Sequence, residues 1–259
     1  MTRPTGPGYL SPPPPRVLAH RGFAENAPEN SLLAFLRALA LGADYLETDV
    51  RATSDGVAVL AHDADIDLGS GARRPIASLL AADLHRIDLG HGQRVPTLAE
   101  ALDGFPDARF NLDIKSADAA APAAAAIRRA RAEQRVLVTS FSEGRRRSAL
   151  RTLPGVASSA SAPVIALTLL ASALRLTPLV ARLLRDVVAV QVPERSHAIR
   201  VVSPRFVRHV HGAGVEVHVW TVNERADMRR LLALGIDGIV TDRTDLALDV
   251  ISERAPLSP

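Results

Sequence analysis

Between residues 45 and 50 the chain runs Tyr45-Leu46-Glu47-Thr48-Asp49-Val50. Successive side chains of a β-strand point to opposite faces, so this run presents Glu47 and Asp49 together on one face. Seven further short runs of apolar or β-branched residues lie at 16–20, 109–114, 136–141, 156–161, 187–192, 215–221 and 238–241. Helical patterns occupy 31–41, 98–102, 119–132, 143–153, 164–185, 204–211, 224–234 and 244–254. This alternation predicts eight parallel strands connected by helices, an α/β fold of the (β/α)8 TIM barrel type.

A hairpin and a long insertion are expected directly after the second strand. The turn Ser54-Asp55-Gly56 precedes an apolar run at 57–62. An Asp-Gly pair between extended residues is typical of a β-hairpin, so this run is predicted to double back on the second strand. Residues 63–96 then form an insertion, and because long loops in compact domains are commonly functional, we expect it to lie over the active site.

Length and composition indicate one barrel-sized domain. The chain has 259 residues, of which 47% are hydrophobic and 23% charged, which excludes a disordered or fibrous protein. We predict a disordered Pro-rich tail at 1–15 and a single barrel domain at 16–255. The tail lacks the apolar core of a secretory signal. The apolar run 163–174 is shorter than the ~20 residues that span a bilayer, so no stable membrane insertion is expected.

Charge and cysteine content exclude several classes of function. The chain contains no cysteine, so disulfides, thiolate metal sites and a cysteine nucleophile are ruled out, and a reducing, cytoplasmic location is favoured. The net charge is only +3 and aromatic residues make up 3%. Because the arginine runs are not interleaved with aromatic side chains, no nucleic-acid partner is expected.

Three carboxylates are candidate metal ligands. Asp113 and Lys115 alternate on the third strand as Glu47 and Asp49 do on the second. Carboxylates that converge from neighbouring strand ends repel one another unless a cation lies among them. Oxygen ligands of this kind suit Mg²⁺ or Ca²⁺ better than zinc. Salt bridges to the many arginines are the alternative interpretation.

Two histidines are candidate proton carriers, because His20 and His62 each end an apolar run. Histidine suits proton transfer near neutral pH, and two can act on opposite sides of a phosphorus atom. The alternative is a structural hydrogen bond for each. Arg21 and Lys115 can bind phosphate oxygens, and Lys115 is the only lysine of the chain, which suggests a need for a compact ammonium group. The remaining histidines are interpreted as surface or structural residues: His85, His91, His197, His209, His211 and His218.

An ordered set of short motifs carries a family resemblance. The motifs are His20-Arg21-Gly22, Pro28-Glu29-Asn30-Ser31, Phe35, Ala38, Gly42-Ala43-Asp44, Glu47-Thr48-Asp49-Val50, Asp55-Gly56, His62-Asp63, Asp113-Ile114-Lys115, Ser140-Phe141, Trp220-Thr221-Val222-Asn223 and Gly238-Ile239-Val240-Thr241-Asp242. Between about residues 16 and 245 the chain thereby resembles the glycerophosphodiester phosphodiesterase family, which belongs to the phospholipase-C-like phosphodiesterase superfamily.

The resemblance implies a metal-dependent hydrolase with its site at the C-terminal mouth of the barrel. It implies hydrolysis of glycerophosphodiesters to glycerol 3-phosphate and an alcohol, through a cyclic phosphate that water opens. By analogy the catalytic acid and base are His20 and His62. One divalent cation would be bound by Glu47, Asp49 and Asp113. This cation is Mg²⁺ or Ca²⁺, with Mn²⁺ as an alternative. Arg21 and Lys115 would bind the phosphate. Trp220 would either pack on the glycerol or alcohol group of the substrate or belong to the core. Glu29 and Asn30 would brace the first loop, while Gly22 permits close backbone approach.

Three departures from the family pattern limit the analogy. Asp113 stands where the family usually has Glu, which shortens the third ligand by one methylene group. Thr244 replaces a usual proline. The segment 63–96 lacks the sequence that is typical of the family, so the resemblance does not predict which alcohol is released.

Two other functions remain as alternatives. One is a related phospholipase or sphingomyelinase-D-like phosphodiesterase, against which the low aromatic content argues, because a lipid enzyme should expose apolar or aromatic loops. The other is a non-catalytic barrel that acts as a binding module, against which the complete set of histidines, carboxylates and lysine argues.

Overall fold

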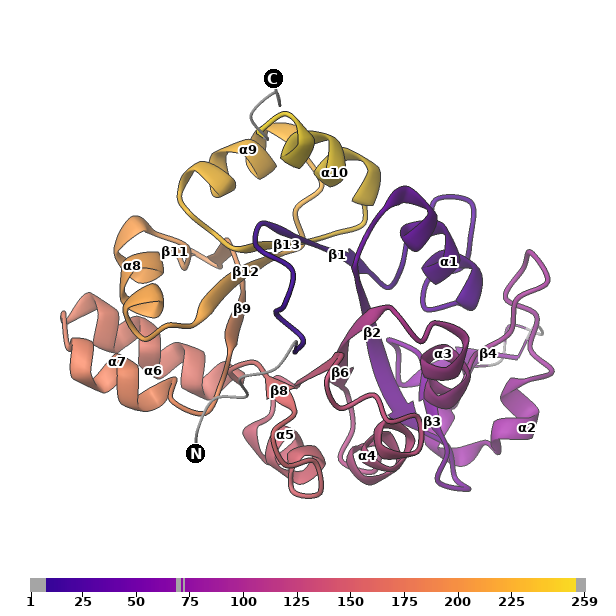
Figure 1. The fold of residues 1–259 in the computed structure, drawn as a ribbon. Helices are drawn as coiled ribbons and strands as arrows, with labels where there is room; N and C mark the ends of the chain where they lie inside the picture. Colours follow the sequence, from indigo (N-terminus) through magenta and orange to yellow (C-terminus); the bar gives the residue numbers. More distant parts are fainter. Residues whose placement is uncertain (1–7, 69–70, 72, 255–259) are drawn as a thin grey trace.

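The fold is a closed ring of parallel strands, as a computed structural model shows for residues 8–68, 71 and 73–254. The strands are β1 (Arg16–His20), β2 (Tyr45–Ala52), β6 (Arg109–Ile114), β7 (Val136–Thr139), β8 (Ala157–Ser158), β9 (Ala189–Pro193), β12 (Glu216–Trp220) and β13 (Gly238–Thr241). They follow one another in the order β8-β7-β6-β2-β1-β13-β12-β9. A parallel bridge between Ser159 and Ala189 joins the two ends of this order. The predicted (β/α)8 barrel is confirmed (Figure 1).

Helices surround the ring on its outer side (Figure 1). They are α1 (Leu32–Leu41), α3 (Leu98–Gly104), α4 (Ala120–Arg129), α5 (Glu143–Leu150), α6 (Ala162–Ala173), α7 (Thr177–Leu183), α8 (Pro204–Gly212), α9 (Arg225–Ala233) and α10 (Thr244–Ser252). Two apolar clusters fill the space between strands and helices, one around Phe35 and Phe110 and the other around Phe206 and Met228. None of the helices in the described part of the chain is both long enough and apolar enough to span a membrane.

The single helix predicted over 164–185 is wrong, because the structure divides it into α6 and α7. Arg175 has a φ angle of 59°, in the left-handed region. Pro178 then occupies the first turn of α7, where its missing N–H costs no hydrogen bond. The proline therefore starts a second helix instead of continuing the first.

The hairpin and the insertion lie beside β2. β3 (Ala58–Leu60) pairs with β2 in antiparallel fashion, as the Asp-Gly turn predicts. The insertion folds into β4 (Asp65–Asp67), β5 (Arg73–Pro75), the 3₁₀ helix η1 (Ile76–Ser78) and α2 (Ala81–Leu84). These elements share a small apolar cluster with β3, formed by Val59, Ile76, Leu79, Leu84 and Val95. A second short hairpin, β10 (Arg195–Ser196) and β11 (Ile199–Arg200), follows β9.

The segment before β1 covers the N-terminal end of the barrel. Tyr9 is only 3% exposed and packs edge-on against Tyr45, with ring centroids 5.1 Å apart. The Tyr45 hydroxyl donates to the Tyr9 carbonyl oxygen over 2.9 Å. The prediction of a disordered tail is therefore wrong from Tyr9 onward, because an aromatic ring finds a buried place against the barrel. Residues 1–7 lie outside the described part.

A line of buried polar side chains runs through the barrel interior. Gln191 contacts His218 at 3.4 Å, and His218 Nε2 lies 3.0 Å from Glu216 Oε2. Both oxygens of Glu216 accept hydrogen bonds from Arg16 at 2.7 Å. Burial acts to raise the pKa of Glu216, but the bonds from Arg16 and His218 outweigh it and lower the pKa to about 2. His218 is thus a structural residue, as the sequence indicated.

Candidate active site

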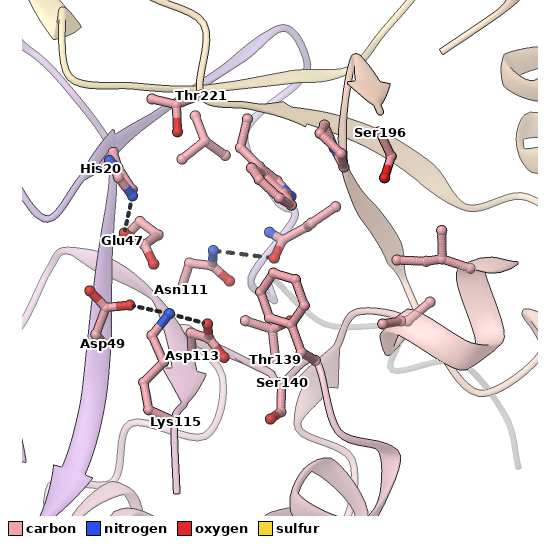
Figure 2. A pocket seen from close by; sticks show the side chains of 18 of the residues that line it. His20, Glu47, Asp49, Asn111, Asp113, Lys115, Thr139, Ser140, Ser196 and Thr221 are labelled. Atoms are coloured by element: carbon pink, nitrogen blue, oxygen red, sulfur yellow. Dashed lines mark hydrogen bonds and ion pairs between the residues drawn. The ribbon is translucent and has the colours of Figure 1, made fainter. Parts of the chain in front are cut away.

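A cavity of about 500 Å³ opens at the C-terminal ends of the strands. Every candidate site residue from the sequence lines it: His20, Arg21, Glu47, Asp49, His62, Asp113, Lys115 and Trp220. Figure 2 shows Ser196 on the side of the cavity opposite to His20, Glu47, Asp49, Asp113 and Lys115. The structure therefore brings together residues that span two hundred positions of the chain. Their chemical roles stay predictions.

Lys115 joins two of the carboxylates. Asp49 and Asp113 are register partners on the adjacent strands β2 and β6. The Lys115 Nζ atom lies 2.8 Å from Asp49 Oδ1 and 2.7 Å from Asp113 Oδ2. Burial acts to lower the pKa of Lys115, but the two carboxylates outweigh it and raise the pKa above its ordinary value. The ammonium group is therefore held charged at the centre of the cluster.

Glu47 lies in surroundings that disfavour its ionised form. Its residue is only 6% exposed. Burial, together with the nearby charges of Asp49 and Asp113, raises the pKa of Glu47 to about 8. Desolvation and like charges both disfavour the ionised form. The site consequently favours a proton or a further cation near this carboxylate.

The carboxylate oxygens of Glu47, Asp49 and Asp113 are the type of ligand that a hard divalent cation prefers. Within the described residues, no three or more His, Asp or Glu side chains are arranged as a ready metal site, and Lys115 lies between Asp49 and Asp113. Asp113 Oδ1, however, is buried without a hydrogen-bond partner. Burial also raises the pKa of Asp113. An unpartnered buried carboxylate oxygen beside Glu47 is the kind of donor that Mg²⁺ or Ca²⁺ takes.

His20 is oriented by a residue from the far end of the chain. Its Nδ1 atom lies 2.7 Å from Asp242 Oδ1, and its Nε2 atom lies 3.9 Å from Glu47 Oε2. Burial acts to lower the pKa of His20, but the hydrogen bond to Asp242 and the charge of Glu47 outweigh it and raise the pKa. Asn223 donates to the second oxygen of Asp242 over 2.7 Å. The His20 ring is thereby fixed with Nε2 toward the carboxylates.

His62 also lines the cavity, and its side chain is 40% exposed. Its Nδ1 atom lies 2.9 Å from Asp63 Oδ1, and Arg73 binds the other Asp63 oxygen over 2.9 Å. Arg51 donates to the His62 carbonyl oxygen. Each of the two histidines therefore has a carboxylate at Nδ1.

The loop after β1 directs Arg21 into the cavity. Arg21 and Gly22 have φ angles of 56° and 83°. A Cβ atom on Gly22 would lie 2.7 Å from the backbone carbon of Ala34, so the predicted close approach is confirmed. The Arg21 guanidinium binds both oxygens of Glu29 at 2.9 Å and lies 3.2 Å from Asp49 Oδ2. Its backbone N–H donates to Glu47 over 3.1 Å.

Asn30 stabilises this loop through side-chain hydrogen bonds. Its side-chain nitrogen donates to Asp49 Oδ2 over 3.2 Å, and its oxygen accepts from the Thr48 hydroxyl over 2.6 Å. Asn30 thereby fixes the orientation of Asp49.

The uncharged side of the cavity begins at an aromatic pair. Trp220 packs edge-on against Phe141 with centroids 5.9 Å apart, and Lys115 Nζ lies 6.0 Å from the Phe141 ring centroid. Beyond this pair, α6 contributes Ala162, Ile165, Ala166 and Leu169. The described residues of the insertion 63–96 do not line the cavity, so its predicted position over the site stays a prediction.

Sequence reasoning gave no role to the cavity residues Asn111 and Phe141 or to the cavity face of α6. It also gave no role to Asp242, which contacts His20. Asn111 lies two residues before Asp113 on the same strand face, which was an available signal. Asp242 directly follows β13, the neighbour of β1, so the strand order was needed to place it beside His20. The cavity face of α6 has no local signal, because this helix is apolar on several faces.

Comparisons with known proteins agree on one family. The model of the glycerophosphoryl diester phosphodiesterase family matches residues 20–246. A protein named probable glycerophosphodiester phosphodiesterase 2 from Mycobacterium tuberculosis is 46% identical over 240 residues, which cover 92% of this chain and 91% of that protein. A glycerophosphodiester phosphodiesterase of Caldanaerobacter subterraneus subsp. tengcongensis is 30% identical, covering 91% and 97%. The crystal structure of a glycerophosphodiester phosphodiesterase from Agrobacterium tumefaciens superposes with a TM-score of 0.74 at 26% identity, covering 92% and 99%.

Proposed function

Since the chain belongs to the glycerophosphoryl diester phosphodiesterase family, whose members are phosphoric diester hydrolases, we propose that two histidines and a divalent cation carry out its reaction. The products are glycerol 3-phosphate and an alcohol. The observation that supports this proposal is the convergence of His20, His62 and three carboxylates with Lys115 in one cavity.

Arg21 and Lys115 bind the phosphate in this proposal. Both cations lie within 3.2 Å of Asp49, so their charges point to a common place above the carboxylates. The non-bridging oxygens of a phosphodiester share one negative charge and accept hydrogen bonds from such donors. Lys115 and Arg21 thereby orient the phosphorus toward the two histidines.

The histidines move the protons. Each has a carboxylate at Nδ1, which leaves Nε2 to exchange a proton with substrate. One histidine accepts the proton of the attacking glycerol hydroxyl group, and the other donates a proton to the oxygen of the departing alcohol, which gives a cyclic phosphate. Water then opens the cyclic phosphate with the roles of the two histidines exchanged, which gives glycerol 3-phosphate. The proton count of the pair is restored over one cycle.

Glu47, Asp49 and Asp113 would hold the cation, either Mg²⁺ or Ca²⁺, with Mn²⁺ as an alternative. When bound, the cation supplies Lewis-acid polarisation of the phosphodiester. The buried Asp113 oxygen without a partner and the raised pKa of Glu47 support this assignment. The cytoplasmic location expected from the sequence stays a prediction.

The test is release of glycerol 3-phosphate from glycerophosphocholine, glycerophosphoethanolamine, glycerophosphoglycerol and glycerophosphoinositol. We expect EDTA to abolish release and one of Mg²⁺, Ca²⁺ or Mn²⁺ to restore it. A His20→Ala/His62→Ala double variant, purified in parallel, controls for contaminating phosphodiesterases. Full activity in EDTA would contradict the role of the cation. Silence with every diester and every metal would favour the non-catalytic binding module instead.

A further inference from the structure

Two neighbouring helices on the outer side of the barrel expose a group of leucines. α6, Ala162–Ala173, contains no charged residue, and α7 packs against it (Figure 1). A helix that is apolar on all sides is ordinarily buried on all sides. In this pair and its turn, however, five leucines are between 41% and 60% exposed, and we call them the leucine face: Leu167, Leu170, Leu174, Leu176 and Leu179.

The leucine face follows the helical repeat. On α6 its members are separated by three and four residues, which places them on one side of the helix. The side that is buried is a different one and carries Thr168, Ala171 and Ser172. On α7 the two exposed leucines are followed by Arg182 at steps of three residues. Single exposed leucines are normal on a protein surface, but an aligned group of them indicates an interaction site.

Positive charge accompanies the leucine face. Between residues 162 and 185 the chain has three arginines, Arg175, Arg182 and Arg185, and neither aspartate nor glutamate. These three charges equal the net charge of +3 of the whole chain. Arg185 lies 3.3 Å from Asp186, whereas Arg175 and Arg182 are exposed and form no ion pair within the described residues. Two guanidinium groups are therefore available to an anionic partner.

This chemistry fits a lipid surface better than a second copy of the chain. In a symmetric dimer the same surface of each copy meets itself, which would bring the arginines of both copies together without a carboxylate between them. An anionic bilayer accommodates both kinds of side chain. Leucines enter the boundary between head groups and acyl chains, while the long arginine side chains reach the lipid phosphates.

We propose that the leucine face, together with Arg175 and Arg182, docks this protein reversibly on the surface of an anionic membrane. α6 has 12 residues, fewer than the ~20 that span a bilayer, so the helix pair lies on the surface and does not cross it. Another side of α6 lines the cavity through Ile165 and Leu169. Docking would consequently hold one wall of the cavity close to the membrane.

Cosedimentation with vesicles tests the proposal. The vesicles are made of phosphatidylcholine alone or with about 30% phosphatidylglycerol, which supplies the negative charge. We expect the wild-type protein to bind the anionic vesicles at least about tenfold more tightly than the neutral ones, and added NaCl to weaken this binding because it screens the charges. Wild-type protein that does not sediment with anionic vesicles would overturn the proposal.

A pair of leucine variants tests the apolar contribution. We expect Leu170→Gln/Leu174→Gln to weaken binding to anionic vesicles by about tenfold, because two partly exposed leucines no longer enter the bilayer. The matched control is Leu36→Gln/Leu41→Gln on α1, where the two leucines are 55% and 44% exposed. α1 lies on the other side of the ring from α6 and α7 (Figure 1), so this control should bind as wild type does. Equal losses in the two variants would contradict the proposed surface.

A pair of arginine variants tests the charge contribution. We expect Arg175→Gln/Arg182→Gln to weaken binding to anionic vesicles by about 20-fold and to leave the weak binding to neutral vesicles unchanged. The control Arg128→Gln/Arg129→Gln removes two exposed arginines from α4 and should have a much smaller effect. An equal effect of both pairs would show that only the total charge matters, which would contradict docking through this surface.

Sedimentation velocity without lipid tests the second copy as an occupant. A dimer that is lost in Leu170→Gln/Leu174→Gln would show that another copy of the chain covers the leucine face, and it would overturn the proposal. Circular dichroism melting checks the fold of every variant, and the arginine pair decides the question should the leucine pair not fold.

Discussion

At the scale of single residues, the orientation of His20 depends on Asp242. The two side chains are 222 positions apart in the chain and 2.7 Å apart in space. A carboxylate that binds Nδ1–H fixes the tautomer with Nε2 free to accept or donate a proton. In the proposed mechanism Asp242 is therefore a positioning residue, since it would act on the substrate only through His20.

We expect Asp242→Asn to lower kcat by roughly 10- to 100-fold with a smaller change in KM. Because the bond to Asp242 raises the pKa of His20, the variant should also shift the His20 titration to lower pH. The measurements are kcat/KM against pH and the His20 ring signals by NMR. Asp245→Asn serves as control, because Asp245 pairs with Arg243. A variant with the wild-type titration would contradict this role.

Removal of either histidine of the proposed acid and base pair should strongly reduce turnover. We expect His20→Ala and His62→Ala each to lower kcat by about 10²- to 10⁴-fold, since general acid and base catalysis contributes rate factors of this size. Circular dichroism melting should show an intact fold. His85→Ala is the control, because His85 lies near Glu100 and does not line the cavity. Near-normal rates in both variants would refute the mechanism.

At the scale of elements, the turn between β1 and α1 depends on one glycine. Gly22 has a φ angle of 83°, and an added Cβ would meet the Ala34 backbone at 2.7 Å. Gly42 at the end of α1 has a φ angle of 105°, with no atom within 4 Å of an added Cβ. The two positions share left-handed backbone but differ in steric room.

Gly22→Ala should therefore lower the free energy of unfolding by roughly 3 kcal/mol, from the left-handed backbone and the clash together. Gly42→Ala should lower it by only about 1 kcal/mol, from the backbone alone. Urea denaturation of both variants measures the difference. Equal losses would show that the approach to Ala34 relaxes without cost.

Helices α6 and α7 show how element-level patterns mislead. The two helices and the turn between them expose leucines, which are Leu167, Leu170, Leu174, Leu176 and Leu179. The low aromatic content argued against an enzyme that acts on lipids, yet here aliphatic side chains supply the exposed apolar surface. Aromatic content alone is therefore a weak argument against apolar substrates in this chain.

At the scale of the whole molecule, buried polar contacts connect the barrel wall across its interior. Glu216 on β12 accepts from Arg16 on β1 and lies 3.0 Å from His218. The Arg16 side chain is only 2% exposed. A buried guanidinium without its carboxylate partner is strongly destabilising.

Protonation of Glu216 should consequently weaken the fold. Its pKa is lowered from 4.5 to about 2, so the stabilisation is complete above about pH 4.5 and is lost as the pH falls toward 2. We expect Glu216→Gln to lower the free energy of unfolding by roughly 3 kcal/mol at pH 7. The difference in the free energy of unfolding between this variant and wild type should disappear as the pH falls from about 4.5 to about 2. Urea titrations at several pH values measure it.

Glu224→Gln controls for the loss of one charge, since Glu224 is exposed. This variant should stay close to wild type at every pH. A gap for Glu216→Gln that is constant with pH would contradict the role of its charge.

The sequence by itself determined the eight strands of the barrel and the identity of the charged cavity residues. Each follows from short-range pattern: alternation defines a strand, and the carboxyl ends of parallel strands meet at one edge. His20, Glu47, Asp49, Asp113 and Lys115 stand at or beside those ends, so their convergence could be predicted without knowing any distance.

Only the tertiary structure decided which side chains contact one another. It placed Asp242 on His20, Lys115 between two carboxylates, Tyr9 against the barrel and one face of α6 toward the cavity. These pairings depend on closure of the ring, which brings β13 beside β1, and on the direction each helix faces once packed. Neither is encoded in local periodicity, because periodicity specifies which residues share a face but not which distant element that face meets.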